Sequence, residues 1–225
     1  MKKSILILFL LSLCISCSSS KNSEEFINKA EGRYLFNANE VLEVYFKEQE
    51  LYVKWRGRDD IKPLKVSEKS FYMKEMNEKM IFITEPTIQI KLAEKTEHKG
   101  VKYHFKKMAA NEKTPHEYFA NKEYKKALEG YLKIKKQDSL NPVIREYEIN
   151  GIGYSYLREK EFEKAIEIFK INTVLHSNSS NTFDSLAEAY LSNKDTTNAI
   201  INYKKALSIN SENKGALRNL KKIMK

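Results

Sequence analysis

The sequence predicts an α+β protein, in which an antiparallel β meander curled into a small barrel or half-barrel precedes an all-α array of repeated helical hairpins. Two observations support this fold class. Through residues 26–110, short segments rich in β-branched and aromatic residues follow one another at about ten-residue spacing, which is typical of a small antiparallel sheet. Residues 111–225 instead repeat one pattern of small and aromatic residues at a fixed period, which is typical of stacked helical hairpins.

The β part is expected to contain seven or eight short strands separated by polar turns. The strands share an apolar character, and in several of them apolar and polar residues alternate. They are expected at residues 32–36, 41–46, 51–55, 64–66, 71–73, 80–84, 88–92 and 101–105. In the last strand, the alternation places Val101, Tyr103 and Phe105 on one face and His104 on the opposite, solvated face.

The helical part is defined by a 34-residue period between Glu146 and Asn213. Six positions of the first copy, Ile152, Gly153, Tyr156, Phe162, Ala165 and Phe169, recur as Leu186, Ala187, Tyr190, Thr196, Ala199 and Tyr203. Small residues at the crossing let two helices approach to an interaxial distance of roughly 8–10 Å, and the aromatic residues fill the space on either side. This pattern resembles the tetratricopeptide repeat. It departs from the repeat at Lys160 and Lys194, where many copies carry glycine, and at Thr196, where an aromatic residue is usual.

A divergent first hairpin is expected at 111–145, ahead of the regular copies at 146–179 and 180–213. Thr114 is the expected N-cap of its first helix, with Pro115 in the first turn and Glu117 completing a capping box. Its Ala127 lies 38 residues before Ala165, which is four more than the 34-residue period. The four extra residues are expected near 141–142. The basic segment 213–225 is expected to form a helix that caps the array.

The β part resembles the small lipocalin-like domain that follows the catalytic domain in penicillin-binding-protein-like serine hydrolases. The resemblance rests on Glu31-Gly32-x-Tyr34, Leu42-x-Val44, Leu51-x-Val53, the strand with Phe71 and the strand 81–83. Some bacterial members of that group continue into tetratricopeptide repeats. This sequence has the same order of the two parts without the catalytic domain, so an accessory subunit that acts on such a hydrolase in trans is an alternative function.

Residues 1–17 are expected to be a targeting segment, which is cleaved before Cys17. Lys2 and Lys3 precede the apolar run 5–13, and Ser16 precedes Cys17. The segment resembles a bacterial lipoprotein signal, which implies that Cys17 is retained and acylated. Cleavage at Cys14 and an ordinary secretory signal remain alternatives. The resemblance implies a lipid-anchored protein of the bacterial cell envelope, at the outer membrane and facing the periplasm, with 18–25 as a tether.

The sequence offers no credible active site. Ser18-x-x-Lys21 matches a serine-hydrolase motif but lies in the expected tether, and the accompanying Ser-Asp-Asn and Lys-Thr-Gly motifs are absent. The four histidines, His98, His104, His116 and His176, lack metal-ligand spacing, and no glycine-rich phosphate loop occurs. The net charge of +10 is interleaved with glutamates along the helices, so solvated helix faces explain it better than nucleic-acid binding. We therefore expect a protein without enzymatic activity, cofactor or metal.

Binding is the remaining function, and the first helix of each hairpin is the expected binding surface. By resemblance, the groove positions are Tyr147, Asn150, Tyr154, Leu157 and Arg158 in the first copy and Asn181, Asp184, Glu188, Leu191 and Ser192 in the second. This mixture suits an extended peptide whose backbone pairs with side chains. The alternatives are that these positions are merely solvated, or that the β part carries a small apolar ligand between strands bearing Tyr45, Trp55 and Phe82.

Overall fold

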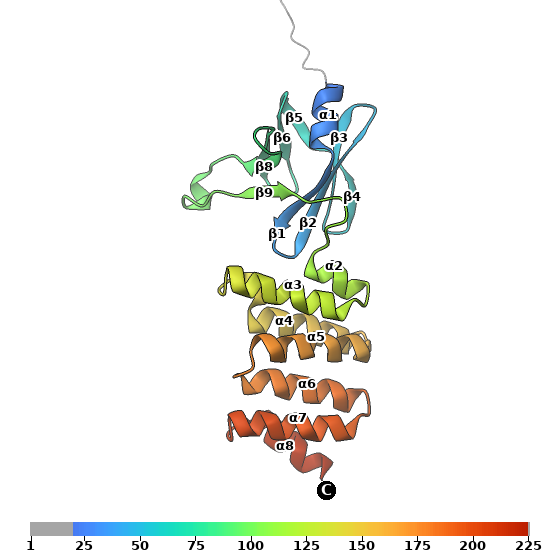
Figure 1. The fold of residues 1–225 in the computed structure, drawn as a ribbon, viewed down its shortest axis with the longest axis vertical. Helices are drawn as coiled ribbons and strands as arrows, with labels where there is room; N and C mark the ends of the chain where they lie inside the picture. The colour runs from blue at the N-terminus through green and yellow to red at the C-terminus, as the bar shows by residue number, and fades with distance from the viewer. Residues whose placement is uncertain (1–19, 225) are drawn as a thin grey trace, which may run out of the picture. The chain divides into compact units, whose positions relative to one another are not determined.

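A computed structural model describes residues 20–224 of the chain, and it confirms the expected α+β fold class (Figure 1). The chain divides into two compact units. The first, here called the β unit, runs up to Tyr34 and resumes from Leu42 to Ala110. The second, here called the helical unit, comprises Leu35–Val41 and the chain from Asn111 onward. The expected signal segment, its acylated Cys17 and the alternative Cys14 lie outside the described residues.

Nine strands form one sheet in the described part of the β unit, in the order β4-β3-β2-β1-β9-β8-β7-β6-β5. Their bounds are β1 Gly32–Asn37, β2 Glu40–Lys47, β3 Glu50–Trp55, β4 Arg58–Ile61, β5 Leu64–Ser67, β6 Ser70–Met73, β7 Glu78–Ile83, β8 Gln89–Leu92 and β9 His104–Lys107. The pairs β2–β3 and β7–β8 are antiparallel, with Val44 opposite Val53 and Phe82 opposite Ile90. Most sequential neighbours therefore pair as in a meander, β1 also pairs with β9, and the sheet curls into a half-barrel.

The alternation expected in β2 and β3 is present, because Leu42 and Val44, and likewise Leu51 and Val53, are buried while the residues between them are not. This puts one face of each strand into the core of the β unit. The register follows from that burial, since a shift by one residue would turn every apolar side chain outward.

Two strand expectations were wrong in detail. No strand was expected between 55 and 64, yet β4 lies there; its first three residues are exposed and its only buried residue is Ile61. The last strand begins at His104 instead of Val101. Val101 and Tyr103 are 52% and 42% exposed, and Tyr103 packs against the ring of His98, with centroids 5.1 Å apart. The segment between β8 and β9 is instead a loop with the 3₁₀ turn η1, Thr96–His98.

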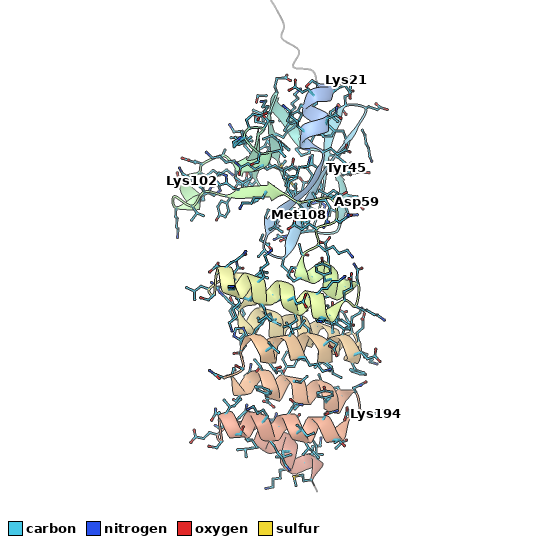
Figure 2. All side chains as sticks on the ribbon, viewed as in Figure 1. Lys21, Tyr45, Asp59, Lys102, Met108 and Lys194 are labelled. Carbon is cyan, nitrogen blue, oxygen red and sulfur yellow. The ribbon has the colours of Figure 1, made fainter. Side chains whose placement is uncertain are left out.

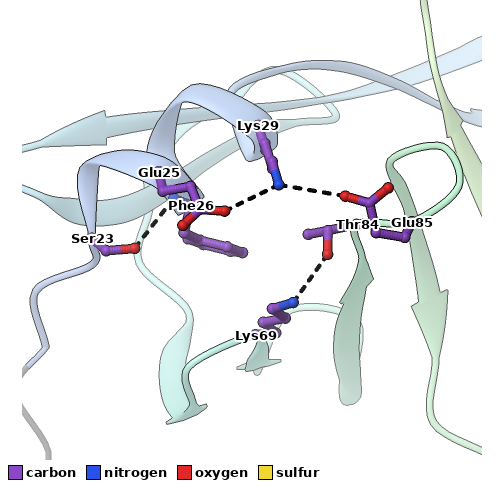
Figure 3. A network of polar contacts seen from close by, with 7 residues as sticks. All are labelled: Ser23, Glu25, Phe26, Lys29, Lys69, Thr84 and Glu85. Atoms are coloured by element: carbon purple, nitrogen blue, oxygen red, sulfur yellow. Dashed lines mark hydrogen bonds and ion pairs between the residues drawn. The ribbon is translucent and has the colours of Figure 1, made fainter.

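The expectation of a tether at 18–25 was also wrong for its C-terminal part, because α1 spans Glu24–Ala30. The Ser23 side chain accepts a hydrogen bond from the backbone N–H of Phe26 at 3.2 Å, and acidic residues occupy the first turn, where the helix dipole favours them (Figure 3). The chain joins the fold even earlier, at Asn22, whose backbone and side chain both donate to the carbonyl of Gln49 at 2.8 Å.

Phe26 of α1 completes the core of the β unit. Its ring lies 6.1 Å from Phe46 on β2, 5.9 Å from Phe71 on β6 and 5.3 Å from Phe82 on β7. These strands belong to both halves of the sheet, so one side chain from α1 joins the two halves. Lys29 adds ion pairs to Glu25 and Glu85 at 3.1 and 3.4 Å (Figure 3).

The helical unit contains three hairpins and a final helix in its described residues (Figure 1). The helices are α2 Pro115–Ala120, α3 Tyr124–Gln137, α4 Glu146–Arg158, α5 Phe162–Leu175, α6 Ser180–Ser192, α7 Thr196–Ile209 and α8 Lys214–Ile223. The capping box of Thr114 and Glu117 begins α2 as expected. The connection from α3 to α4 contains the 3₁₀ turn η2, Pro142–Ile144, and is four residues longer than that from α5 to α6.

Small residues mark the helix crossings, as the sequence pattern predicts. Ala127, Ala165 and Ala199 are each completely buried. Gly153 is tighter still, because a Cβ atom placed there would lie 2.4 Å from the ring of Phe169. The close approach within the α4–α5 hairpin therefore depends on the absence of a side chain at Gly153.

A lysine ends the first helix of every hairpin in the left-handed conformation. Lys122, Lys160 and Lys194 have φ of 60°, 60° and 63° (Lys194 is labelled in Figure 2). Backbone hydrogen bonds from Lys194 to Leu191 and from Asp195 to Tyr190, both 2.9 Å, have the pattern of a Schellman motif, and the other two hairpins repeat it. The backbone thus keeps the conformation that glycine usually provides, although each lysine bears the steric cost of a Cβ atom there.

Candidate functional site

Five of the ten expected groove residues come from one surface, which we call the first-helix face because α4, α6 and α8 are the first helices of their repeats. Asn150 and Tyr154 lie one helical turn apart on α4, and Asp184 and Glu188 occupy the same two positions on α6, 34 residues later. Residues four apart project from one side of a helix. The face is therefore built from equivalent positions of successive repeats.

Two hydrogen bonds between side chains join α4 to α6 on the surface of this face. The Asn181 side-chain amide donates to Glu146 at 2.8 Å, and the Tyr154 hydroxyl donates to Glu188 at 3.0 Å. Asn181 and Glu188 are exposed, whereas Tyr154 is half-buried. Four side chains thus form a continuous polar surface across the two helices.

Beneath this surface, Asn150 belongs to a buried network. Its amide donates to the Ser185 hydroxyl at 3.1 Å, and its carbonyl oxygen accepts from Asn172 at 3.0 Å. Asn150 is only 9% exposed. This expected groove residue therefore holds α4, α5 and α6 together. Its partners Ser185 and Asn172 were not among the residues predicted from the sequence.

The remaining expected positions are dispersed. Leu157 is half-buried and packs against the cluster that contains Ala165 and Phe169, so it contributes to the core. Tyr147 is 61% exposed near the start of α4, where its hydroxyl accepts a hydrogen bond from Arg145 at 3.1 Å. Arg158 is exposed at the end of α4. In the second copy, Leu191 packs against the core cluster around Tyr203, and Ser192 is exposed at the end of α6.

Tyr154 is held as a hydrogen-bond donor. Burial raises its pKa to about 12, the bond with Ser185 opposes the shift, and the negative charge of Glu188 adds to it. Its ring meets the edge of Phe169 at 5.3 Å, which fixes its orientation. At neutral pH the phenol therefore stays protonated and presents its O–H to the Glu188 carboxylate.

The next seam along the face lies between α6 and α8. Asp184 is half-buried there and touches α8 so closely that a Cβ atom at Gly215 would lie 2.5 Å from its Oδ2. Burial raises the pKa of Asp184 and the charge of Glu188 raises it further, whereas Asn213 and Arg218 lower it. Asp184 therefore carries a partly desolvated charge beside a second carboxylate.

Of the residues expected to hold an apolar ligand in the β unit, Trp55 and Phe82 are buried and Tyr45 is not. Phe82 is buried among aromatic rings, including that of Phe26. Trp55 is 8% exposed and lies under the guanidinium of Arg56, 4.4 Å from its ring. Tyr45 follows buried Val44 in the strand and donates its hydroxyl to Asp60 at 2.6 Å. The core side chains fill the region around Phe82.

Residues 20–224 contain no cluster of three or more histidine, cysteine, aspartate or glutamate side chains arranged to hold a metal ion. None of the helices in this part of the chain combines the length and apolar character needed to cross a membrane.

Comparisons with known proteins concern the helical unit. Residues 182–213 match the family model described as Tetratricopeptide repeat. The Sgt2 tetratricopeptide domain from Aspergillus fumigatus is 22% identical, with 49% of this chain and 72% of that chain covered and a TM-score of 0.35. The second such domain of human RPAP3, solved with an HSP70 peptide, is 21% identical over 49% and 89%, with a TM-score of 0.35. The MamA protein is 20% identical over 48% and 57%, with a TM-score of 0.33.

No curated protein matches the sequence. The family match covers α7 and most of α6, and α4–α5 repeats the same pattern of small and aromatic residues 34 residues earlier. The chain thus carries a tetratricopeptide repeat at residues 182–213, as the sequence pattern predicts.

Proposed function

We propose that this protein is a non-catalytic component of the bacterial cell envelope whose repeats bind an extended segment of a partner protein. The observation that carries the proposal is the continuous polar surface of the first-helix face, where Asn181 and Glu188 meet Glu146 and Tyr154 across two helices. An extended segment has unpaired backbone N–H and C=O groups, and carboxylate, amide and hydroxyl side chains on a rigid surface are suitable partners for them.

The packing of the helical unit also favours the binding of a partner. Core clusters around fully buried Ala165, Phe169, Ala199 and Tyr203 set the spacing of the first helices, so the face is rigid before a partner arrives. A rigid surface loses less conformational entropy on binding than a flexible one.

Site-specific photocrosslinking in intact cells tests this proposal. A benzophenone amino acid replaces Asn181 on α6, and the matched control replaces Ile201 on α7, which is 56% exposed. We expect one defined adduct from position 181 and none from position 201. Equal labelling at both positions, or no adduct at position 181 in cells that contain the folded protein, would contradict binding through the first-helix face.

The anchoring segment is a second part of the proposal. If Cys17 is acylated, only four residues separate it from Asn22, where the chain joins the β unit. At about 3.5 Å per residue, those five steps reach at most roughly 18 Å. The β unit would therefore be held close to the outer membrane on its periplasmic side.

Fractionation of cells tests the anchor. Cys17→Ser should move the protein from the membrane fraction to the soluble fraction, whereas the control Cys14→Ser should leave it in the membrane fraction. The opposite result would place the lipid on Cys14, and membrane association of both variants would remove the lipid from the proposal.

A further inference from the structure

Two carboxylates on α6 lack a cationic partner. Asp184 and Glu188 lie one turn apart, and no lysine, arginine or histidine among residues 20–224 forms an ion pair with either. On α5, by contrast, Lys164 pairs with Glu161 and Lys170 pairs with Glu167. The chain as a whole carries ten more basic than acidic side chains. Asp184 is half-buried and Glu188 is exposed, so the desolvation cost of an unpaired charge applies to Asp184.

A buried and unsatisfied hydroxyl lies beside this pair. Tyr203 of α7 is completely buried, and its hydroxyl has no hydrogen-bond partner. Tyr203 shares a core cluster with Ala187, one turn after Asp184 on α6, and with Ala216, which follows the Gly215 that Asp184 touches. Burial raises the pKa of Tyr203 to about 12, and the charges of Asp184 and Glu188 add to the shift. Asn219 of α8 lies close enough to lower that pKa without forming a hydrogen bond of good geometry.

In the preceding repeat, the polar groups at the same positions have hydrogen-bond partners within the chain. There, Phe169 replaces Tyr203 and brings no hydroxyl, while Asn150 replaces Asp184 and is neutral. Asn150 and Tyr154 both bond to Ser185 of the next helix. The polar groups of α4 are therefore partnered within the chain. At the α6–α8 seam, Glu188 accepts a hydrogen bond from Tyr154, but neither carboxylate has a cationic partner among the described residues, and the Tyr203 hydroxyl has no hydrogen-bond partner.

We propose that Asp184, Glu188 and the Tyr203 hydroxyl form a binding site for a lysine or arginine side chain. This inference rests on the proposed function, because the cation belongs to the segment that the first-helix face binds. An ammonium group has three donors and no acceptor, and the site offers two carboxylates and one phenol oxygen. Hydrogen bonds that also carry charge are the strong ones in such a site.

The neighbouring positive charge on α8 is part of the same site. Arg218 lies near enough to lower the pKa of Asp184 but forms no ion pair with it. A bound cation must therefore compete with Arg218 for Asp184. Removal of this charge by Arg218→Gln should tighten binding of a basic segment.

Selection from a random octapeptide display library against the full chain tests the site and its parent proposal separately. We expect enriched peptides to share one position that is lysine or arginine. Enrichment without a basic position would overturn the cation site while leaving peptide binding intact. A lack of any enrichment, with the protein folded by circular dichroism, would overturn both.

Fluorescence anisotropy with an enriched peptide then identifies the residues. Asp184→Asn and Glu188→Gln should each weaken binding by about tenfold or more, since each removes a charge-assisted bond. The control Glu163→Gln removes an exposed charge on α5 and should leave the affinity unchanged.

Tyr203→Phe gives a readout that a purely structural role would not produce. The lost hydroxyl has no partner in the free chain, so thermal stability should stay the same or rise, while peptide affinity falls by about threefold or more. A variant that binds as tightly as the parent chain would remove Tyr203 from the site. Equal binding by Asp184→Asn and the parent chain would remove the site itself.

Discussion

Two glycines in the same helix provide a direct test of the α4–α5 packing. Gly151 and Gly153 are both inside α4, and neither has a left-handed backbone. A Cβ atom at Gly151 would meet nothing within 4 Å. At Gly153 it would lie 2.4 Å from two ring carbons of Phe169 and 2.9 Å from a third. The two sites thus share their backbone environment and differ in what a methyl group would touch.

The expected magnitudes follow from this difference. In a helix interior, replacing glycine by alanine stabilises by about 1 kcal/mol, so Gly151→Ala should raise the free energy of unfolding by that amount. Gly153→Ala gains the same term but overpacks the fully buried ring of Phe169, which typically costs about 1–3 kcal/mol. Ala187 faces Tyr203 at the equivalent crossing, which shows that such a hairpin can accommodate a methyl group. We therefore expect Gly153→Ala to be net destabilising by about 1 kcal/mol.

Urea denaturation followed by circular dichroism at 222 nm measures both variants. The two should differ by about 2 kcal/mol, with opposite signs relative to the parent chain. A third variant, Gly153→Ala with Phe169→Leu, removes the ring edge and should recover part of the loss, as a double-mutant cycle will show. If Gly153→Ala stabilised the chain as much as Gly151→Ala, the close helix approach described here would be wrong.

Four further substitutions test other parts of the fold. Ala165→Leu should cost about 1–3 kcal/mol, because Ala165 is fully buried at a helix crossing, and an unchanged melting midpoint would contradict that placement. Lys160→Gly and Lys194→Gly should each raise the free energy of unfolding by about 0.5 kcal/mol. Glycine adopts φ near 60° without steric cost, although it loses more entropy on folding. A loss of stability would argue against the left-handed turn. Phe26→Ala should cost about 3–5 kcal/mol, as measured by the fluorescence of Trp55, the chain's one tryptophan; a loss below 1 kcal/mol would mean that α1 does not belong to the core.

The sequence predicted best those elements whose residues repeat at a period. The 34-residue recurrence locates α4 to α7, and the alternation in β2 and β3 locates the paired strands, because burial selects the same residue types at each repeat. α1 has no period to detect, since a seven-residue helix with one large buried side chain, Phe26, makes less than two turns of contact. Its available signal was Ser23 before an acidic first turn, which the preceding serine-rich run obscured.

Two strands were predicted incorrectly, β4 because its residues are charged and β9 because part of the expected segment lacks a neighbouring strand. β4 is an edge strand with three exposed charged residues, so neither face carries an apolar pattern. In the segment expected as the last strand, Val101 and Tyr103 continue the alternation of apolar and polar residues but lie before β9. The strand β8, which pairs with β9, ends at Leu92, so they have no strand to pair with on that side. A periodic pattern indicates what a segment could bury, while burial itself requires a neighbouring strand.

The first-helix face shows why the candidate site was predicted only in outline. Core positions keep their character through the repeats, as Ala165 and Ala199 do, because the helix crossing tolerates few alternatives. The face positions change at every step: Asn150, Asp184 and Arg218 occupy one position in α4, α6 and α8. The hairpin geometry can therefore be read from the period, whereas the bonds on the face depend on which side chain each successive helix provides. Extending the same period into α8 places Asn219 at the position of Ser185, and Asn219 is the α8 side chain that affects the Tyr203 hydroxyl.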